Sequence, residues 1–166
     1  MKRIKIGAGA LLMLGSMMIS DRAEILILYF LSAFLHECGH LFAAVLLGVG
    51  VREIRFEFSG IRICTDEKLM SYKSEILLAA AGPLANFICV GACVASFLLC
   101  GIPYGEVTAL TDAFISGREY SRVGAVGFFA ISALLQGGLN LLPVRSFDGG
   151  RILYCTVTLL LGQRAA

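Results

Sequence analysis

Long apolar runs, each broken by only a few ionisable residues, dominate the chain. A helix needs about 20 mostly apolar residues to cross a bilayer. Three runs meet this length, and two shorter runs are candidates for further spans. The long runs cover 24–48, 74–100 and 123–143, and the short ones cover 5–19 and 151–162. The pattern predicts an all-α integral membrane protein, a bundle of about four to five transmembrane helices.

The segment between the second and third of these five runs has a different period. In "VREIRFEFSGIRIC", Ile54, Phe56 and Phe58 alternate with charged residues, and Ser59-Gly60 marks a turn before the alternation resumes. A period of two broken by a turn predicts a small β-hairpin with free edges. The alternative is an amphipathic connector that lies on the lipid surface.

Composition agrees with a membrane protein and narrows the partners. The 166 residues are 58% hydrophobic and 16% charged, with a mean hydropathy of +0.84. The net charge is only +2, and the chain has no basic run beyond the N-terminal "KRIK". We therefore expect the lipid bilayer as a partner and no nucleic acid. We expect one domain over 1–166, with no separate soluble regulatory domain. The six cysteines are interpreted as small apolar packing residues.

The distribution of Lys and Arg predicts the orientation in the membrane. These residues cluster in the first five positions and around the hairpin, whereas the loop 101–122 holds only Arg118 and Arg122. Basic residues favour the cytoplasmic side. We therefore expect the N-terminus and the hairpin in the cytoplasm. The first 20 residues also fit a signal peptide, but no small-residue cleavage site follows, which favours an uncleaved first span.

The stretch "HECGH" lies inside the second apolar run and contains both histidines of the chain. On a helix, His36 and His40 lie one turn apart on the same face and can bind one metal ion. Glu37 projects beside them, where it can accept a proton from a metal-bound water. Zinc suits this donor set. Ionisable side chains are costly in a membrane, which favours function over chance.

A third protein ligand is expected, and Asp148 in "NLLPVRSFDGGRIL" is the candidate. Apart from Glu37, it is the one acid set well away from the hydrophilic loops. The following Gly149-Gly150 permits a tight turn or a close backbone approach. The alternative is that Asp148 is the N-cap of a helix starting near Arg151, and the two roles are compatible.

Two further polar positions interrupt apolar runs. In "AAAGPLANFICV", Gly82-Pro83 predicts disturbed backbone pairing next to a buried or wet cavity. Asn86 lies in that stretch, and Asn140 lies later in the chain. Either side-chain amide can hydrogen-bond to a substrate backbone or to a carbonyl oxygen that becomes negative during attack. The alternative for both is a hydrogen bond between helices.

Together, "HECGH", "AGPLAN" and "NLLPVRSFDGGR" resemble the motifs of the site-2 protease family of intramembrane zinc metalloproteases, in the family's order. "FSGIRI" and the short chain look more like the stage IV sporulation protein FB branch. One departure is that Ser146-Phe147 stands where members often have Pro-Leu before the aspartate.

The resemblance implies one Zn²⁺ per chain, held by His36, His40 and Asp148, with Glu37 as general base. It places Asn86, Asn140, Gly82 and Pro83 near the substrate. The implied function is hydrolysis of a peptide bond in or next to a transmembrane segment, in regulated proteolysis of a signalling precursor in a bacterial cytoplasmic membrane. The expected partners are a membrane-protein or membrane-associated peptide substrate and a regulatory membrane protein.

Two other interpretations stay open from the sequence. Intramembrane His, Glu and Asp also mark ion pathways, so a metal-ion transporter or an inactive pseudoprotease is the alternative function. A transporter usually shows internal repeats, which the sequence lacks, and a pseudoprotease usually loses a ligand or the glutamate.

Overall fold

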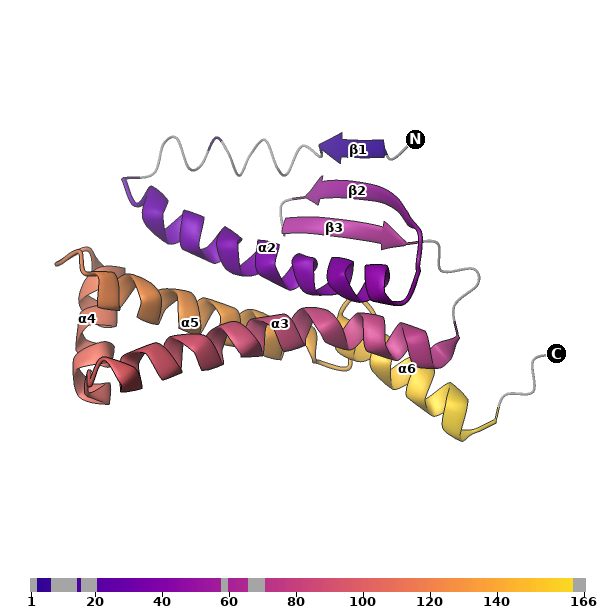
Figure 1. The fold of residues 1–166 in the computed structure, drawn as a ribbon. Helices are drawn as coiled ribbons and strands as arrows, with labels where there is room; N and C mark the ends of the chain where they lie inside the picture. Colours follow the sequence, from indigo (N-terminus) through magenta and orange to yellow (C-terminus); the bar gives the residue numbers. More distant parts are fainter. Residues whose placement is uncertain (1–2, 7–14, 16–20, 58–59, 66–70, 163–166) are drawn as a thin grey trace.

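The computed structural model describes residues 3–6, 15, 21–57, 60–65 and 71–162. Within these residues the chain forms helices and a small sheet, which Figure 1 labels in chain order. The helices are α2 (Ala23–Leu46), α3 (Tyr72–Leu99), α4 (Tyr104–Ser116), α5 (Arg122–Asn140) and α6 (Asp148–Leu160). The strands are β1 (Arg3–Ile6), β2 (Val51–Glu57) and β3 (Gly60–Thr65).

Three of the described helices, α2, α3 and α5, are long and apolar enough to cross a membrane. Many of their large apolar side chains are exposed, including Phe42 at 66% and Leu98 at 74%. A surface this apolar is a liability in water but fits contact with lipid chains. Helix α6 has 13 residues, so at 1.5 Å per residue it is only about 20 Å long, short of a bilayer core.

The helices pack closely because small residues lie at their crossings. Helix α2 packs on α3 and α5, α3 also contacts α5 and α6, and α4 packs on α5. A β-carbon at Gly39 would lie 2.4 Å from the carbonyl oxygen of Ala81, and one at Gly137 would lie 3.1 Å from the β-carbon of Asn86. Small residues let membrane helices approach until backbone atoms touch.

The sheet lies over the side of α2 that faces away from α3 (Figure 1), with β3 in contact with α2. Its strand order is β1-β2-β3. Strand β1 pairs with β2 in parallel, with Ile4 opposite Ile54, and β2 pairs with β3 antiparallel, with Ile54 opposite Ile63. Strand β2 is therefore central, and both of its edges are paired.

The predicted fold class is wrong. The chain is not an all-α bundle of four to five spans with a separate two-stranded hairpin, because three described helices qualify as spans and a three-stranded sheet accompanies them. Strand β1 was missed because "RIKI" merges with the apolar run that follows it. Its partner lies about 50 residues away, and such non-local pairing leaves no local pattern.

Other boundaries differ as well. The predicted span 5–19 lies outside the described residues except for Lys5 and Ile6, which belong to β1, and Gly15. The segment 101–122, interpreted as a loop, contains helix α4. Helix α6 begins at Asp148, three residues before the predicted 151–162, so this acid lies in the first turn of a helix.

Candidate metal centre

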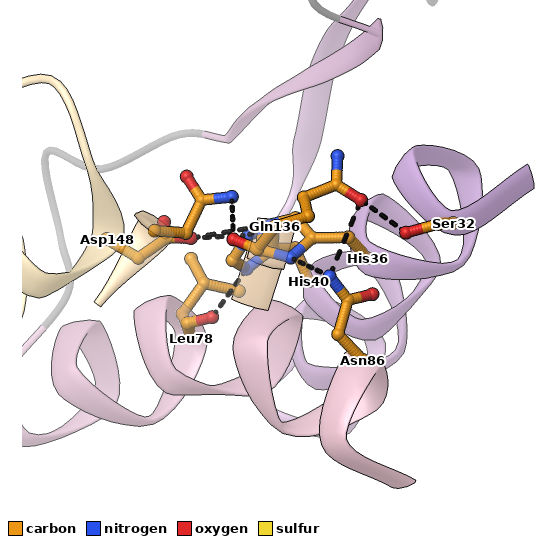
Figure 2. A network of polar contacts seen from close by, with 8 residues as sticks. Ser32, His36, His40, Leu78, Asn86, Gln136 and Asp148 are labelled. Carbon is orange, nitrogen blue, oxygen red and sulfur yellow. Dashed lines mark hydrogen bonds and ion pairs between the residues drawn. The ribbon is translucent and has the colours of Figure 1, made fainter. Parts of the chain in front are cut away.

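The two histidines and Asp148 meet in one cluster, although Asp148 lies 112 residues from His36 along the chain. His36 and His40 extend from the same face of α2, and their Nε2 atoms are 3.2 Å apart. Oδ2 of Asp148 lies 3.1 Å from Nε2 of His36 and 3.3 Å from Nε2 of His40. Figure 2 shows the three side chains converging from α2 and α6. We call these three residues the ligand cluster.

The dimensions of the ligand cluster fit one face of a zinc coordination tetrahedron. Zinc bonds of about 2.0–2.1 Å at tetrahedral angles place neighbouring ligand atoms about 3.3–3.4 Å apart. The three observed separations are 3.1, 3.2 and 3.3 Å. Two imidazoles and one carboxylate are also the donors that zinc accepts, and three protein ligands leave one position open. The residues present therefore fit the metal.

Glu37 lies beside the ligand cluster without belonging to its triangle. It is half-buried, and a carboxylate oxygen of Glu37 and one nitrogen from each histidine all lie within 4.8 Å of one another. A carboxylate at this distance can act on a ligand of the metal through hydrogen bonding rather than by direct coordination. The structure thus brings Glu37 next to the two histidines, and its role as general base stays a prediction.

The cluster lies inside the span, near the end of α2 that leads to the sheet. His40 is six residues and His36 ten residues from Leu46, the last residue of α2. At 1.5 Å per residue, the histidines are about 9–15 Å from that end. His36 is 4% exposed, so the ligand atoms are shielded from bulk solvent.

Helix α3 forms a wall against which both histidines pack. Nδ1 of His40 donates a hydrogen bond to the carbonyl oxygen of Leu78, at 2.8 Å. A β-carbon at Gly82 would lie 2.3 Å from Nε2 of His40 and 2.7 Å from Nε2 of His36. Glycine is thus required at 82 because both imidazole rings lie against the helix backbone. The predicted break at Gly82-Pro83 is absent, since α3 continues through Pro83, which is buried.

Asp148 reaches the histidines because two glycines let α6 begin close to the preceding turn. A β-carbon at Gly149 would lie 2.1 Å from the carbonyl oxygen of Leu141, and one at Gly150 would lie 2.1 Å from that of Val144. Neither glycine has a positive φ, so close approach rather than a left-handed turn requires them. The N-cap of α6 is Phe147, and Asp148 lies in the first turn, where the helix dipole favours an anion.

The charge of Asp148 is set by opposing effects. Burial raises the pKa of its carboxyl. Hydrogen bonds with His36 and His40 and the charges of these residues outweigh burial and lower this pKa to about 2. A carboxyl with this pKa is ionised at neutral pH. Asp148 therefore offers the deprotonated oxygen that a metal ligand needs.

The two predicted asparagines have different surroundings. Asn86 has no exposed surface, and its side-chain amide lies 3.4 Å from Nδ1 of His36. Asn140, at the end of α5, is half-buried and donates from Nδ2 to the backbone carbonyl of Gln136 at 3.1 Å. The structure thus brings Asn86 to His36 and pairs Asn140 within its own helix. A substrate contact for either residue stays a prediction.

Sequence reasoning missed two residues of this network. The Ser32 hydroxyl donates to Oε1 of Gln136 at 2.6 Å, and the Gln136 amide lies 3.5 Å from that of Asn86. Figure 2 shows these side chains on the side of His36 away from Asp148. A signal was present: Ser32 precedes His36 by four residues, and Gln136 is the one long polar side chain within 123–139.

The fold and the site define a polytopic membrane protein with a buried donor set suited to a metal. The pattern of Peptidase family M50 matches residues 24–165, so the chain belongs to this family.

A zinc metalloprotease of Methanocaldococcus jannaschii is 32% identical over 131 residues, which cover 79% of this chain. The chain spans only 33% of that protein's length. The solved site-2 protease of Methanocaldococcus jannaschii has the same fold, with a TM-score of 0.64 at 24% identity. That match covers 93% of this chain and 67% of the solved one.

Proposed function

We propose that the protein is a zinc-dependent intramembrane endopeptidase that hydrolyses a peptide bond within or next to a transmembrane segment of another membrane protein. The observation that carries the proposal is the ligand cluster with Glu37 beside it, inside a candidate span. Membership of Peptidase family M50 and the similarity to a zinc metalloprotease support the same activity.

His36, His40 and Asp148 would hold one zinc ion per chain. When bound, zinc supplies a Lewis acid that polarises the scissile carbonyl and acidifies a water molecule. We infer that the described residues supply the other requirements of hydrolysis. The ionised Asp148 balances part of the metal's charge, and the wall formed by α3 fixes both imidazole rings and helps exclude bulk water from the site.

Glu37 is assigned the role of general base and then general acid. Its carboxylate takes a proton from the attacking water and returns a proton to the leaving amine nitrogen. Asn140 is proposed to line the substrate path at the end of α5, where it can donate to the oxyanion. Gly82 and Pro83 remain proposed site residues, since Gly82 lies directly against the Nε2 atoms of both imidazoles.

The substrate is proposed to enter from the lipid, unwind and lie extended along the sheet. A helix hides its carbonyls in its own hydrogen bonds, so unwinding must precede cleavage. Both edges of β2 are paired, so an added strand is limited to the outer edges of β1 and β3. Strand β3 contacts α2, the helix that carries the histidines, which favours the β3 edge.

We place the N-terminal strand and the hairpin in the cytoplasm of a bacterium. Pairing of β1 with β2 supports the same side for both, and the basic residues favour the cytoplasm. Regulated cleavage of a signalling precursor and control by a regulatory membrane partner complete the proposal. We also propose the finer assignment to the stage IV sporulation protein FB branch, which the resemblance of "FSGIRI" supports.

The test compares wild type with Glu37→Gln after reconstitution into liposomes with a panel of single-span membrane proteins. We expect wild type to cleave at least one of them, and Glu37→Gln to lose about 100-fold or more of that rate while it retains zinc. Glu106→Gln, an exposed residue on α4, is the matched control. Full activity of Glu37→Gln would contradict the assigned role. A wild type that binds zinc and cleaves none of the panel would favour a pseudoprotease.

A further inference from the structure

His36 has two ring nitrogens with different surroundings. Nε2 faces His40 and Asp148, at 3.2 and 3.1 Å. A neutral imidazole that offers the Nε2 lone pair to a metal carries its proton on Nδ1. The ring is 4% exposed, so water cannot readily accept this proton, and a buried donor without an acceptor is costly. The proposed metal site therefore needs an acceptor behind His36.

The side-chain amide of Asn86 occupies that place, completely buried and 3.4 Å from Nδ1. Its neighbours decide how it is oriented. The amide atom that faces His36 also lies 3.2 Å from the backbone N–H of Gly137, which is a donor, while the other amide atom lies 3.3 Å from the carbonyl oxygen of Ser32. Both contacts are satisfied when Oδ1 faces Gly137 and His36 and Nδ2 donates to Ser32. The same amide atom lies 3.5 Å from Oε1 of Gln136, a longer contact than the 3.2 Å to the Gly137 N–H, so the donor at Gly137 decides the orientation.

Three helices hold this amide in place. Ser32 belongs to α2, Asn86 to α3, and Gln136 and Gly137 to α5. The Ser32 hydroxyl and the Gln136 amide are 2.6 Å apart, so this hydrogen bond joins α2 to α5 next to Asn86 (Figure 2). A β-carbon at Gly137 would press on Asn86 at 3.1 Å, so the small residue there lets α5 approach the amide.

The other histidine has an equivalent arrangement. Nδ1 of His40 donates to the Leu78 carbonyl at 2.8 Å. Leu78, Gly82 and Asn86 are spaced by four residues and share one face of α3, opposite His40 and His36 on α2. A backbone carbonyl, which cannot be mutated, orients one ring, and a side chain orients the other.

We propose that Asn86 is a positioning residue: its buried amide accepts the Nδ1 proton of His36 and thereby presents Nε2 of this ring to the ligand cluster. The inference rests on the proposed zinc site and deepens it. Asn86 acts through His36, and an amide without exposed surface is better placed for this role than for a contact with substrate. Partners of this kind typically change metal affinity by about 10–100-fold.

The test measures zinc affinity by chelator competition in the full-length protein in detergent, together with the absorption spectrum of the Co²⁺-loaded protein. Asn86→Ala removes the acceptor and is expected to weaken zinc binding by about 10–100-fold and to alter the Co²⁺ spectrum. Asn86→Asp keeps an acceptor oxygen and is expected to stay within a few-fold of wild type. Thr111→Val, which alters a buried polar residue on α4, is the control and should match wild type.

A purely structural role predicts the opposite ranking, because Asn86→Asp buries a charge and should be at least as damaging as Asn86→Ala. That ranking, or Asn86→Ala with wild-type affinity and spectrum, would overturn the inference while the protease proposal stands. Nitrogen-15 NMR of the histidines in zinc-loaded wild type gives an answer that needs no variant to fold. We expect the proton of His36 on Nδ1, and a proton on Nε2 would overturn the inference. A wild type without zinc affinity would overturn both proposals.

Discussion

The ligand cluster is assembled from two regions that depend on different physical causes. His36 and His40 belong to one turn of α2, and their spacing alone makes them neighbours. Asp148 joins them from the first turn of α6, 112 residues from His36. The histidine pair needs a wall with space for two rings, and Gly82 provides it. Asp148 needs its helix to begin against the 141–145 turn, and Gly149 and Gly150 permit this. The position of the histidines therefore depends on helical spacing, and the position of Asp148 depends on a close approach between backbone segments.

The largest expected effect comes from adding a side chain at Gly82, where α3 packs against both histidines. In Gly82→Ala, the added methyl would lie 2.3 and 2.7 Å from the two Nε2 atoms, so both rings must move or the helices must separate. We expect zinc affinity to fall by about 100-fold or more, beyond the usual effect of a single outer partner. Chelator competition measures it. Gly91→Ala on the same helix meets nothing within 4 Å and should match wild type. Wild-type affinity of Gly82→Ala would contradict the observed placement of the rings.

A smaller effect is expected from moving Asp148 alone. In Gly149→Ala, the methyl would lie 2.1 Å from the Leu141 carbonyl oxygen, which shifts the start of α6 while the histidines stay in place. We expect zinc affinity to fall by about 10–100-fold, as for the loss of a supporting contact.

The matched control for Gly149→Ala is Gly138→Ala on α5, where a β-carbon meets nothing within 4 Å. The Co²⁺ spectrum separates the two regions: Gly149→Ala should resemble Asp148→Ala, and Gly82→Ala should not. Identical spectra for the two glycine variants would show that the regions are not independent.

The smallest effect concerns the ion pair that joins α6 to the start of α3. Nη2 of Arg151 lies 3.3 Å from Oε1 of Glu75, and both side chains are partly exposed. Pairs of this kind contribute about 0–1 kcal/mol. Glu75→Gln should therefore lower zinc affinity by less than about fivefold and leave the Co²⁺ spectrum unchanged. A loss as large as that of Gly149→Ala would mean that the ion pair, rather than glycine packing, sets the position of Asp148.

The features that the sequence predicted depend on local spacing, and the features that it did not predict depend on contacts between distant segments. Helical spacing joined His36 to His40, and the rarity of buried acids singled out Asp148. The apolar runs lie within three residues of the ends of α2, α3 and α5. Helix α4 was missed although Val107, Leu110, Thr111 and Phe114 follow helical spacing, because polar residues lie among them. The pairing of β1 with β2 and the contacts of Ser32 and Gln136 join distant segments, and no single-segment pattern contains them.

The zinc content per chain in the protein purified without chelators, compared with that of His36→Ala and Asp148→Ala, tests directly whether these residues hold one metal ion. We expect about one zinc per chain in wild type and much less in both variants, because each variant removes one of the three ligands of the same ion. Glu37→Gln should keep its zinc, since that carboxylate lies outside the triangle. A wild type that holds no zinc and cannot be reconstituted with it, or an Asp148→Ala variant that keeps a full complement of zinc, would contradict a zinc site formed by His36, His40 and Asp148.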